Sequence, residues 1–277
     1  MISQQLHGIG IGLRSCHYPF IKTHKPPIDW FEILADNYFG NNNAHLSHLD
    51  PIRSFYPVTL HSVGMSIGST DSIRFDYLHA LKKLIQQVEP LMVSDHLCWT
   101  SFNNQYFHEL LPLPYTEEAV RHTSERIKII QDFLGRQIMI ENVSSYLAFK
   151  HSTMTEWEFL QAVAEEANCL ILLDINNIFV SAKNNNFNAI DYLQKLFTKK
   201  RVAQFHLGGY ENQGTYLLDT HSAAVHSPVW DLFTKAIEKF GMIPTAIEWD
   251  NNIPDFPDLL KEAEKAKSIM ERYASLA

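Results

Sequence analysis

Short apolar runs rich in β-branched and aromatic residues recur along the whole chain, and amphipathic segments of helical period lie between most of them. We interpret the runs as buried strands at residues 9–13, 30–34, 58–61, 91–95, 138–141, 170–174, 202–206 and 245–248. The amphipathic segments predict helices at 72–88, 116–134, 155–167, 189–197, 228–240 and 256–274. Buried strands that alternate with helices are typical of a parallel α/β sheet.

Two connections near the start of the chain are less regular. The segment 15–27 contains three prolines and is predicted to be a loop over one face, whereas 44–55 is a weak helix interrupted by Pro51. The asparagine runs at 41–43 and 184–186 are expected to be solvated turns.

The number of strands and the length of the chain together favour one closed barrel. A chain of 277 residues with eight strands suits a (β/α)8 TIM barrel, which typically takes about 250 residues. No linker, composition break or internal repeat marks a boundary, so we expect one domain over 1–277. A doubly wound open sheet is the alternative fold.

Composition and charge limit the possible partners. The chain carries 31 acidic and 23 basic residues, a net charge of −8, which disfavours a phosphate backbone as partner, so we expect no nucleic acid. No apolar stretch reaches the roughly 18 residues that span a bilayer, and residues 1–14 lack a signal-peptide pattern. We therefore expect a cytoplasmic protein with no membrane partner.

Metal-ligand residues stand at or just after the last apolar residue of six predicted strands. These strand-end residues are His61, His96, Glu141, Asp174, His206 and Glu248, and Asp219 and His221 follow in the loop after the seventh strand. The carboxyl ends of barrel strands converge on one pocket, where barrel enzymes have their active sites.

Carboxylates gathered in one pocket repel each other unless cations neutralise them. Eight candidate ligands exceed the roughly four to six that one ion takes, which predicts two or three ions with a bridging carboxylate. The three cysteines, Cys16, Cys98 and Cys169, form no CxxC motif, so we expect no thiolate ligand.

Other polar residues carry weaker signals. His108 and Glu109 resemble the start of an HExxH motif, but Pro112 stands where the second histidine would be, so we expect them in a loop at the pocket rim. Glu32 and Asn37 belong to the same rim, and for Glu32 a role in supporting the site or contacting the substrate and a purely structural role are both open.

The ordered motifs resemble those of the multinuclear non-heme iron-dependent oxidases, the barrel family that includes the iron oxidase of methanobactin biosynthesis. The resemblance runs from about residue 8 to residue 250. The matching segments, in order, are LHSVG, SDHL, IENVSSY, LLDINNIFVSAKN, FHLGGY, DTH and IEWD. The ligand order is also that of the xylose isomerase-like superfamily, which includes the trinuclear-zinc endonuclease IV.

The resemblance implies how the residues share the ions. One iron is held by His61, His96 and Glu141, and Glu141 bridges to a second iron. The ligands that the resemblance implies for the second iron are Asp174, His206 and Glu248, and for a third Asp219 and His221. Asn177 and Asp250 are implied as catalytic polar groups beside the irons, with Asp250 as a proton acceptor.

The resemblance also implies the reaction and the partners. The family uses O2 to oxidise cysteine residues of a ribosomally made precursor peptide, which a separate protein presents to the enzyme. The alternative is a zinc or manganese hydrolase or isomerase of the endonuclease IV or sugar isomerase type, with the same ligands and no redox step. Asn177 weakens the endonuclease reading, because endonuclease IV has a histidine there. A metal-storage or interaction barrel is a third interpretation.

Overall fold

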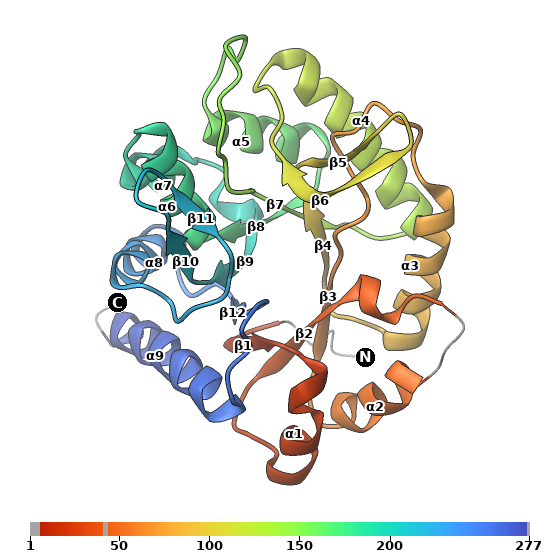
Figure 1. Ribbon diagram of the computed structural model, residues 1–277, viewed down its shortest axis with the longest axis vertical. Coiled ribbons are helices and arrows are strands. Elements are labelled where there is room, and N and C mark those ends of the chain that lie inside the picture. Colours follow the sequence, from red (N-terminus) through yellow and green to blue (C-terminus); the bar gives the residue numbers. More distant parts are fainter. Residues whose placement is uncertain (1–5, 41–43, 276–277) are drawn as a thin grey trace.

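The computed structural model describes residues 6–40 and 44–275, and its strands close into the predicted parallel barrel (Figure 1). Around the barrel the order is β1-β12-β9-β8-β7-β4-β3-β2, and each neighbouring pair is parallel. The barrel strands are β1 (Ile9–Gly12), β2 (Trp30–Leu34), β3 (Val58–His61), β4 (Val93–His96), β7 (Met139–Glu141), β8 (Leu170–Asp174), β9 (Val202–Leu207) and β12 (Thr245–Ile247). Closure rules out the open sheet.

The six predicted helices are confirmed, with ends within three residues of those expected. They are α3 (Phe75–Val88), α4 (Glu117–Leu134), α5 (Glu156–Glu166), α7 (Ala189–Lys195), α8 (Ser227–Phe240) and α9 (Phe256–Ala274), and they surround the barrel (Figure 1). Thr116 caps α4 by accepting a hydrogen bond from the Ala119 N–H, and Thr155 forms a capping box with Glu158. Among the described helices, none combines the length and the hydrophobicity that crossing a membrane requires.

The loop predicted at 15–27 is wrong over most of its length. Two short helices, η1 (Ser15–His17) and α1 (Tyr18–His24), occupy it, because Pro19 falls in the first turn of α1, where its missing N–H breaks no helical bond. The weak helix expected at 44–55 is α2 (Ala44–Arg53), which ends two residues beyond Pro51. Two further 3-10 turns are η2 (Ala35–Tyr38) and η3 (Lys199–Arg201).

A helix that the pattern did not predict, α6 (Ile175–Asn185), begins directly after β8. Asp174 caps it by accepting a 2.6 Å hydrogen bond from the Asn177 N–H. The turn expected at 184–186 is therefore wrong except at Asn186, which ends α6 in the left-handed conformation. The run at 41–43 lies outside the described residues.

Two antiparallel hairpins were also not predicted. The hairpin β5 (Trp99–Phe102) and β6 (Gln105–Leu111) follows β4, and β10 (Tyr210–Asn212) and β11 (Leu217–Asp219) follow β9. Both leave the carboxyl ends of barrel strands, so they stand at the mouth of the barrel (Figure 1).

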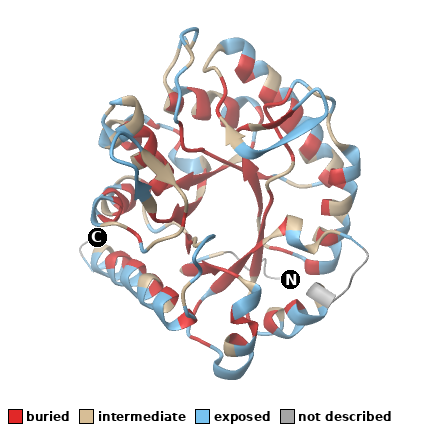
Figure 2. Cartoon of the chain, viewed as in Figure 1, coloured by how far each residue is buried: buried red, intermediate tan, exposed pale blue. Residues whose placement is uncertain are grey.

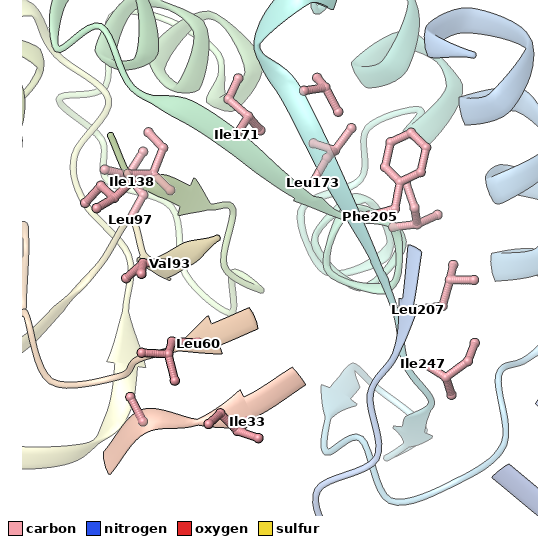
Figure 3. Packing of buried hydrophobic residues seen from close by; sticks show 14 of the residues in the cluster. Ile33, Leu60, Val93, Leu97, Ile138, Ile171, Leu173, Phe205, Leu207 and Ile247 are labelled. Carbon is pink, nitrogen blue, oxygen red and sulfur yellow. The ribbon is translucent and has the colours of Figure 1, made fainter. Parts of the chain in front are cut away.

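Alternation along the strands separates an apolar outer layer from a polar interior. Figure 2 shows the barrel strands as buried, and Figure 3 shows the apolar side chains of neighbouring strands, among them Leu173 and Phe205. Phe205 contacts Phe233 and Phe240 of α8, which places this set between barrel and helices. The alternate residues, such as Glu32 and His206, contact each other inside the barrel. The interior therefore carries the polar chemistry.

Candidate metal centre

The first group of candidate ligands lies at the ends of β3, β4 and β7. The Nε2 atoms of His61 and His96 are 3.2 Å apart, and each lies 3.3 Å from Oε2 of Glu141. All three residues are buried. The geometry brings together the three residues that the sequence assigned to one ion.

A second group extends from Glu141 to β8, β9 and β12. Its ligand atoms, from Glu141, Asp174, His206 and Glu248, lie within 4.8 Å of one another. Nδ1 of His206 is 3.3 Å from Oε1 of Glu141 and 3.0 Å from Oε2 of Glu248. Glu141 thus faces the first group with one oxygen and the second with the other, the arrangement that a bridging carboxylate needs.

A third group contains His221, Glu248 and Asp250. Nδ1 of His221 lies 3.2 Å from Oε2 of Glu248 and 3.4 Å from Oδ2 of Asp250. Asp219 stands on the other side of the imidazole ring, 2.9 Å from Nε2 of His221, and accepts a hydrogen bond from Asn176. The third group therefore includes Asp250, for which the family resemblance implies a proton-accepting role, and leaves Asp219 beside it.

Several atoms of these groups lack the hydrogen bonds that a bound cation would replace. Oε2 of Glu141, Oδ2 of Asp174 and Nδ1 of His206 are buried and have no hydrogen bond within the described part of the chain. Unpaired buried polar atoms are costly, and bound cations relieve this cost. Imidazole nitrogens and carboxylate oxygens without a thiolate suit iron, zinc and manganese. We conclude that the clustered residues could hold metal ions.

The electrostatics divide the histidines into two kinds. Burial and the neighbouring His96 lower the pKa of His61, and burial lowers the pKa of His96 to about 4, so both are neutral and have free lone pairs. Burial also opposes charge on His206, but Glu32, Glu248 and Glu141 outweigh it and raise its pKa well above the usual value. A metal ion in the second group would therefore displace a proton from His206.

Residues deeper in the barrel orient these ligands. Glu32, at the centre of β2, lies 2.6 Å from Nε2 of His206 and accepts hydrogen bonds from Thr59 and Gln204. Burial raises the pKa of Glu32, but the charge of His206 outweighs it and lowers the pKa to about 2. Nδ1 of His206 is thereby directed at the metal groups, which gives Glu32 a supporting position beside the site.

Asn177 supports the site through its own hydrogen bonds. Its Oδ1 accepts from Ser144 and its Nδ2 donates to the carbonyl of Asn142, while its backbone N–H donates to Asp174. Both ends of its amide are thus occupied by protein groups.

All three groups border one cavity of about 790 Å³ at the mouth of the barrel. Asn37, Cys16 and Arg14 belong to its wall. Cys98 and Cys169 are buried, and no cysteine joins the ligand groups found among the described residues. Arg14 was missed from the sequence, although it follows the first strand directly.

Arg14 fixes the outer edge of the third group. Its guanidinium forms an ion pair with Oδ1 of Asp250 and donates a 3.1 Å hydrogen bond to the Trp249 carbonyl. The loops after the first and the last barrel strand are thereby joined. Oδ2 of Asp250 remains directed at His221.

The sequence is similar to those of known proteins. A family model described as RiPP precursor modification enzyme MbnB/TglH/ChrH matches residues 8–271. A UPF0276 protein of Acaryochloris marina is 49% identical over 265 residues, which cover 96% of this chain and 95% of the relative. A UPF0276 protein of Anaeromyxobacter is 45% identical over 267 residues, covering 96% and 94%.

Solved structures show the same fold at low identity. An L-ribulose 3-epimerase has a TM-score of 0.64 at 14% identity and covers 98% of both chains. A xylose isomerase domain containing protein of Salmonella typhimurium has a TM-score of 0.60 at 15% identity, covering 99% of this chain and 98% of the other. The expected TIM-barrel fold is confirmed.

Proposed function

The chain belongs to the family of RiPP precursor modification enzymes MbnB/TglH/ChrH, and from this premise we propose that it is an iron-dependent oxidase acting on a ribosomally made peptide. The proposed reaction uses O2 to modify cysteine residues of the precursor, which a partner protein presents. The observation that supports it most is the set of three overlapping ligand groups that share Glu141 and Glu248.

The ligand groups suggest which residues hold the ions. His61, His96 and Glu141 would hold one, and Glu141 would share a second with Asp174, His206 and Glu248. His221 and Glu248 would hold a third together with Asp250, and Asp219 stays within reach of His221. Iron, when bound, supplies redox chemistry with O2 toward a substrate thiolate, for which a site without cysteine ligands leaves room.

Other residues of the chain orient the ligands and face the substrate. Glu32 holds Nε2 of His206, so that Nδ1 faces the metal groups. Asp250 is the most exposed member of the third group, with 40% of its side chain accessible, and it borders the cavity. When the third group holds no ion, Oδ2 of Asp250 would accept a proton from the substrate. Asn177 ties the start of α6 to the loop after β7 and so keeps Asp174 in place.

Metal analysis of protein purified without oxygen tests the proposal. We expect two or more irons per chain by elemental analysis, with coupled iron in the Mössbauer spectrum of an isotopically enriched sample. The next step is to incubate the iron protein with cysteine-containing precursor peptides and O2, and to measure the mass change of the peptide. Stoichiometric zinc or manganese without iron, persisting after growth in iron-rich medium, would contradict the oxidase and favour a hydrolase or isomerase.

A further inference from the structure

Two hairpins flank the mouth of the barrel, and their outer edges differ. On β11, Asn184 hydrogen-bonds both backbone groups of Leu217, at 2.8 and 2.9 Å. The backbone N–H of Asp219 donates to the Tyr146 hydroxyl at 2.9 Å. Side chains therefore close the edge of the β10–β11 hairpin.

The β5–β6 hairpin is closed on its inner side only. The Thr100 N–H donates to Ser66, and the Ser101 carbonyl accepts from Ser69, so β5 is fixed to the loop after β3. Within the described chain β6 pairs with β5 alone, and its outer edge faces no other strand. The register between the two strands shifts between the pairs Trp99–Leu111 and Ser101–Tyr106, which leaves residues 107–110 of β6 out of regular pairing with β5.

A second cavity, of about 450 Å³, lies beside this strand. Aromatic side chains of Phe39, Tyr77, Tyr106 and Phe107 line it, and Tyr106 and Phe107 are 48% and 41% exposed. Exposed aromatic rings on an open strand edge invite aggregation unless a partner uses them.

The cavity beside β6 adjoins the metal cavity. Val63, which follows the ligand His61 by two residues, and Leu110 on β6 line both. A peptide lying in the aromatic cavity would therefore run beside the wall of the metal cavity. This shared wall distinguishes the β5–β6 side of the mouth from the β10–β11 side.

We propose that the outer edge of β6 and the aromatic cavity beside it bind an extended segment of the precursor peptide. The peptide main chain adds to β6 as a further strand, and an aromatic or branched apolar side chain enters the cavity, so that the residue to be modified reaches the metal groups. Strand addition supplies affinity through main-chain hydrogen bonds, and the side-chain cavity supplies selectivity. The inference rests on the peptide substrate of the proposed function and requires neither iron nor O2.

Selection from a displayed peptide library tests this surface. The probe is a library of short linear peptides with one fixed cysteine and otherwise random residues, selected on the purified full-length protein under anaerobic conditions. We expect the enriched peptides to share an aromatic or branched apolar residue at a fixed spacing from the cysteine. Their affinities are then measured by fluorescence anisotropy against wild type and two variants.

The variants separate this groove from exposed aromatic surface in general. Phe107→Ser should weaken binding at least about tenfold, as loss of an anchoring aromatic does, whereas Phe197→Ser, at a residue 73% exposed outside both cavities, should leave it unchanged. Methylation of the peptide's backbone nitrogens beside the anchor should also weaken binding. Failure to enrich any peptide, or equal affinity for wild type and Phe107→Ser, would overturn the inference. Because iron is not needed, these results are independent of whether the protein oxidises its substrate.

Discussion

Glu141 and Glu156 are both withdrawn from solvent, at 1% and 9% exposure, but their neighbours differ. Glu141 faces the imidazoles of His61, His96 and His206, and its Oε2 has no hydrogen bond within the described chain. Glu156 accepts hydrogen bonds from the hydroxyls of Tyr192 and Tyr115, and it belongs to none of the ligand groups.

Burial raises the pKa of both carboxylates, but their neighbours differ. Burial raises the pKa of Glu156 to about 7, and the tyrosines only partly offset this, so the group is a neutral acid in weakly acidic solution. Glu141 stands among imidazoles and carboxylates, and a single added proton would not give every unpaired atom there a hydrogen bond. Burial therefore does not indicate a metal site by itself. What indicates one at Glu141 is the group of imidazoles and carboxylates around it.

The largest expected effect is the loss of metal from Glu141→Gln. Because Glu141 belongs to two ligand groups, this variant should lose more than one metal ion per chain and should lose activity. His221→Ala, which removes a member of the third group alone, should lose at most one ion. Elemental analysis of both proteins, purified side by side, measures the difference, and equal losses would contradict the bridging role.

At Glu156 the expected effect concerns stability. The folded chain holds this proton up to about pH 7, whereas an ordinary glutamate releases it near 4.5. Stability is therefore lost as the pH rises through this window, by up to about 3 kcal/mol. Glu156→Gln cannot ionise, so above about pH 7 it should be more stable than wild type, and below about pH 4 the two should be similar.

Denaturant unfolding of wild type and Glu156→Gln across this pH range measures the effect. Metal content serves as the control, because Glu156 belongs to none of the ligand groups. A constant difference between the two proteins at every pH would show that Glu156 is not a titrating neutral acid.

The sequence predicted the barrel and its ligand-bearing strands because short apolar runs and polar strand ends are local signals. His61, Asp174 and His206 each stand at a visible end of an apolar run. The helix α6 escaped prediction because its buried face includes Asn176 and Asn177, which read as polar until the site that they support is known.

Contacts between distant segments could not be predicted in the same way. Arg14 meets Asp250 only because the barrel closes β1 against β12. His221 contacts Glu248 and Asp250 as well as Asp219, and its backbone is left-handed, with φ of 43°. Such conformations are set by loop packing and leave no mark in hydrophobic periodicity.

The smallest expected effect on metal content comes from substitution of Cys98. This residue is a third buried acidic group, and it belongs to none of the ligand groups. Cys98 is 0% exposed, and burial raises the pKa of its thiol well above the usual value, so it behaves as a small apolar side chain. Cys98→Ser should keep the full number of ions, although it buries a hydroxyl and costs about 1–3 kcal/mol of stability if that hydroxyl finds no partner. Elemental analysis and denaturant unfolding separate the two effects, with Cys98→Ala as the control that buries no hydroxyl. If either variant lost metal while still folded, a thiolate would belong to the ligand set, and the distinction between histidine-lined and histidine-free buried acids would no longer locate the site.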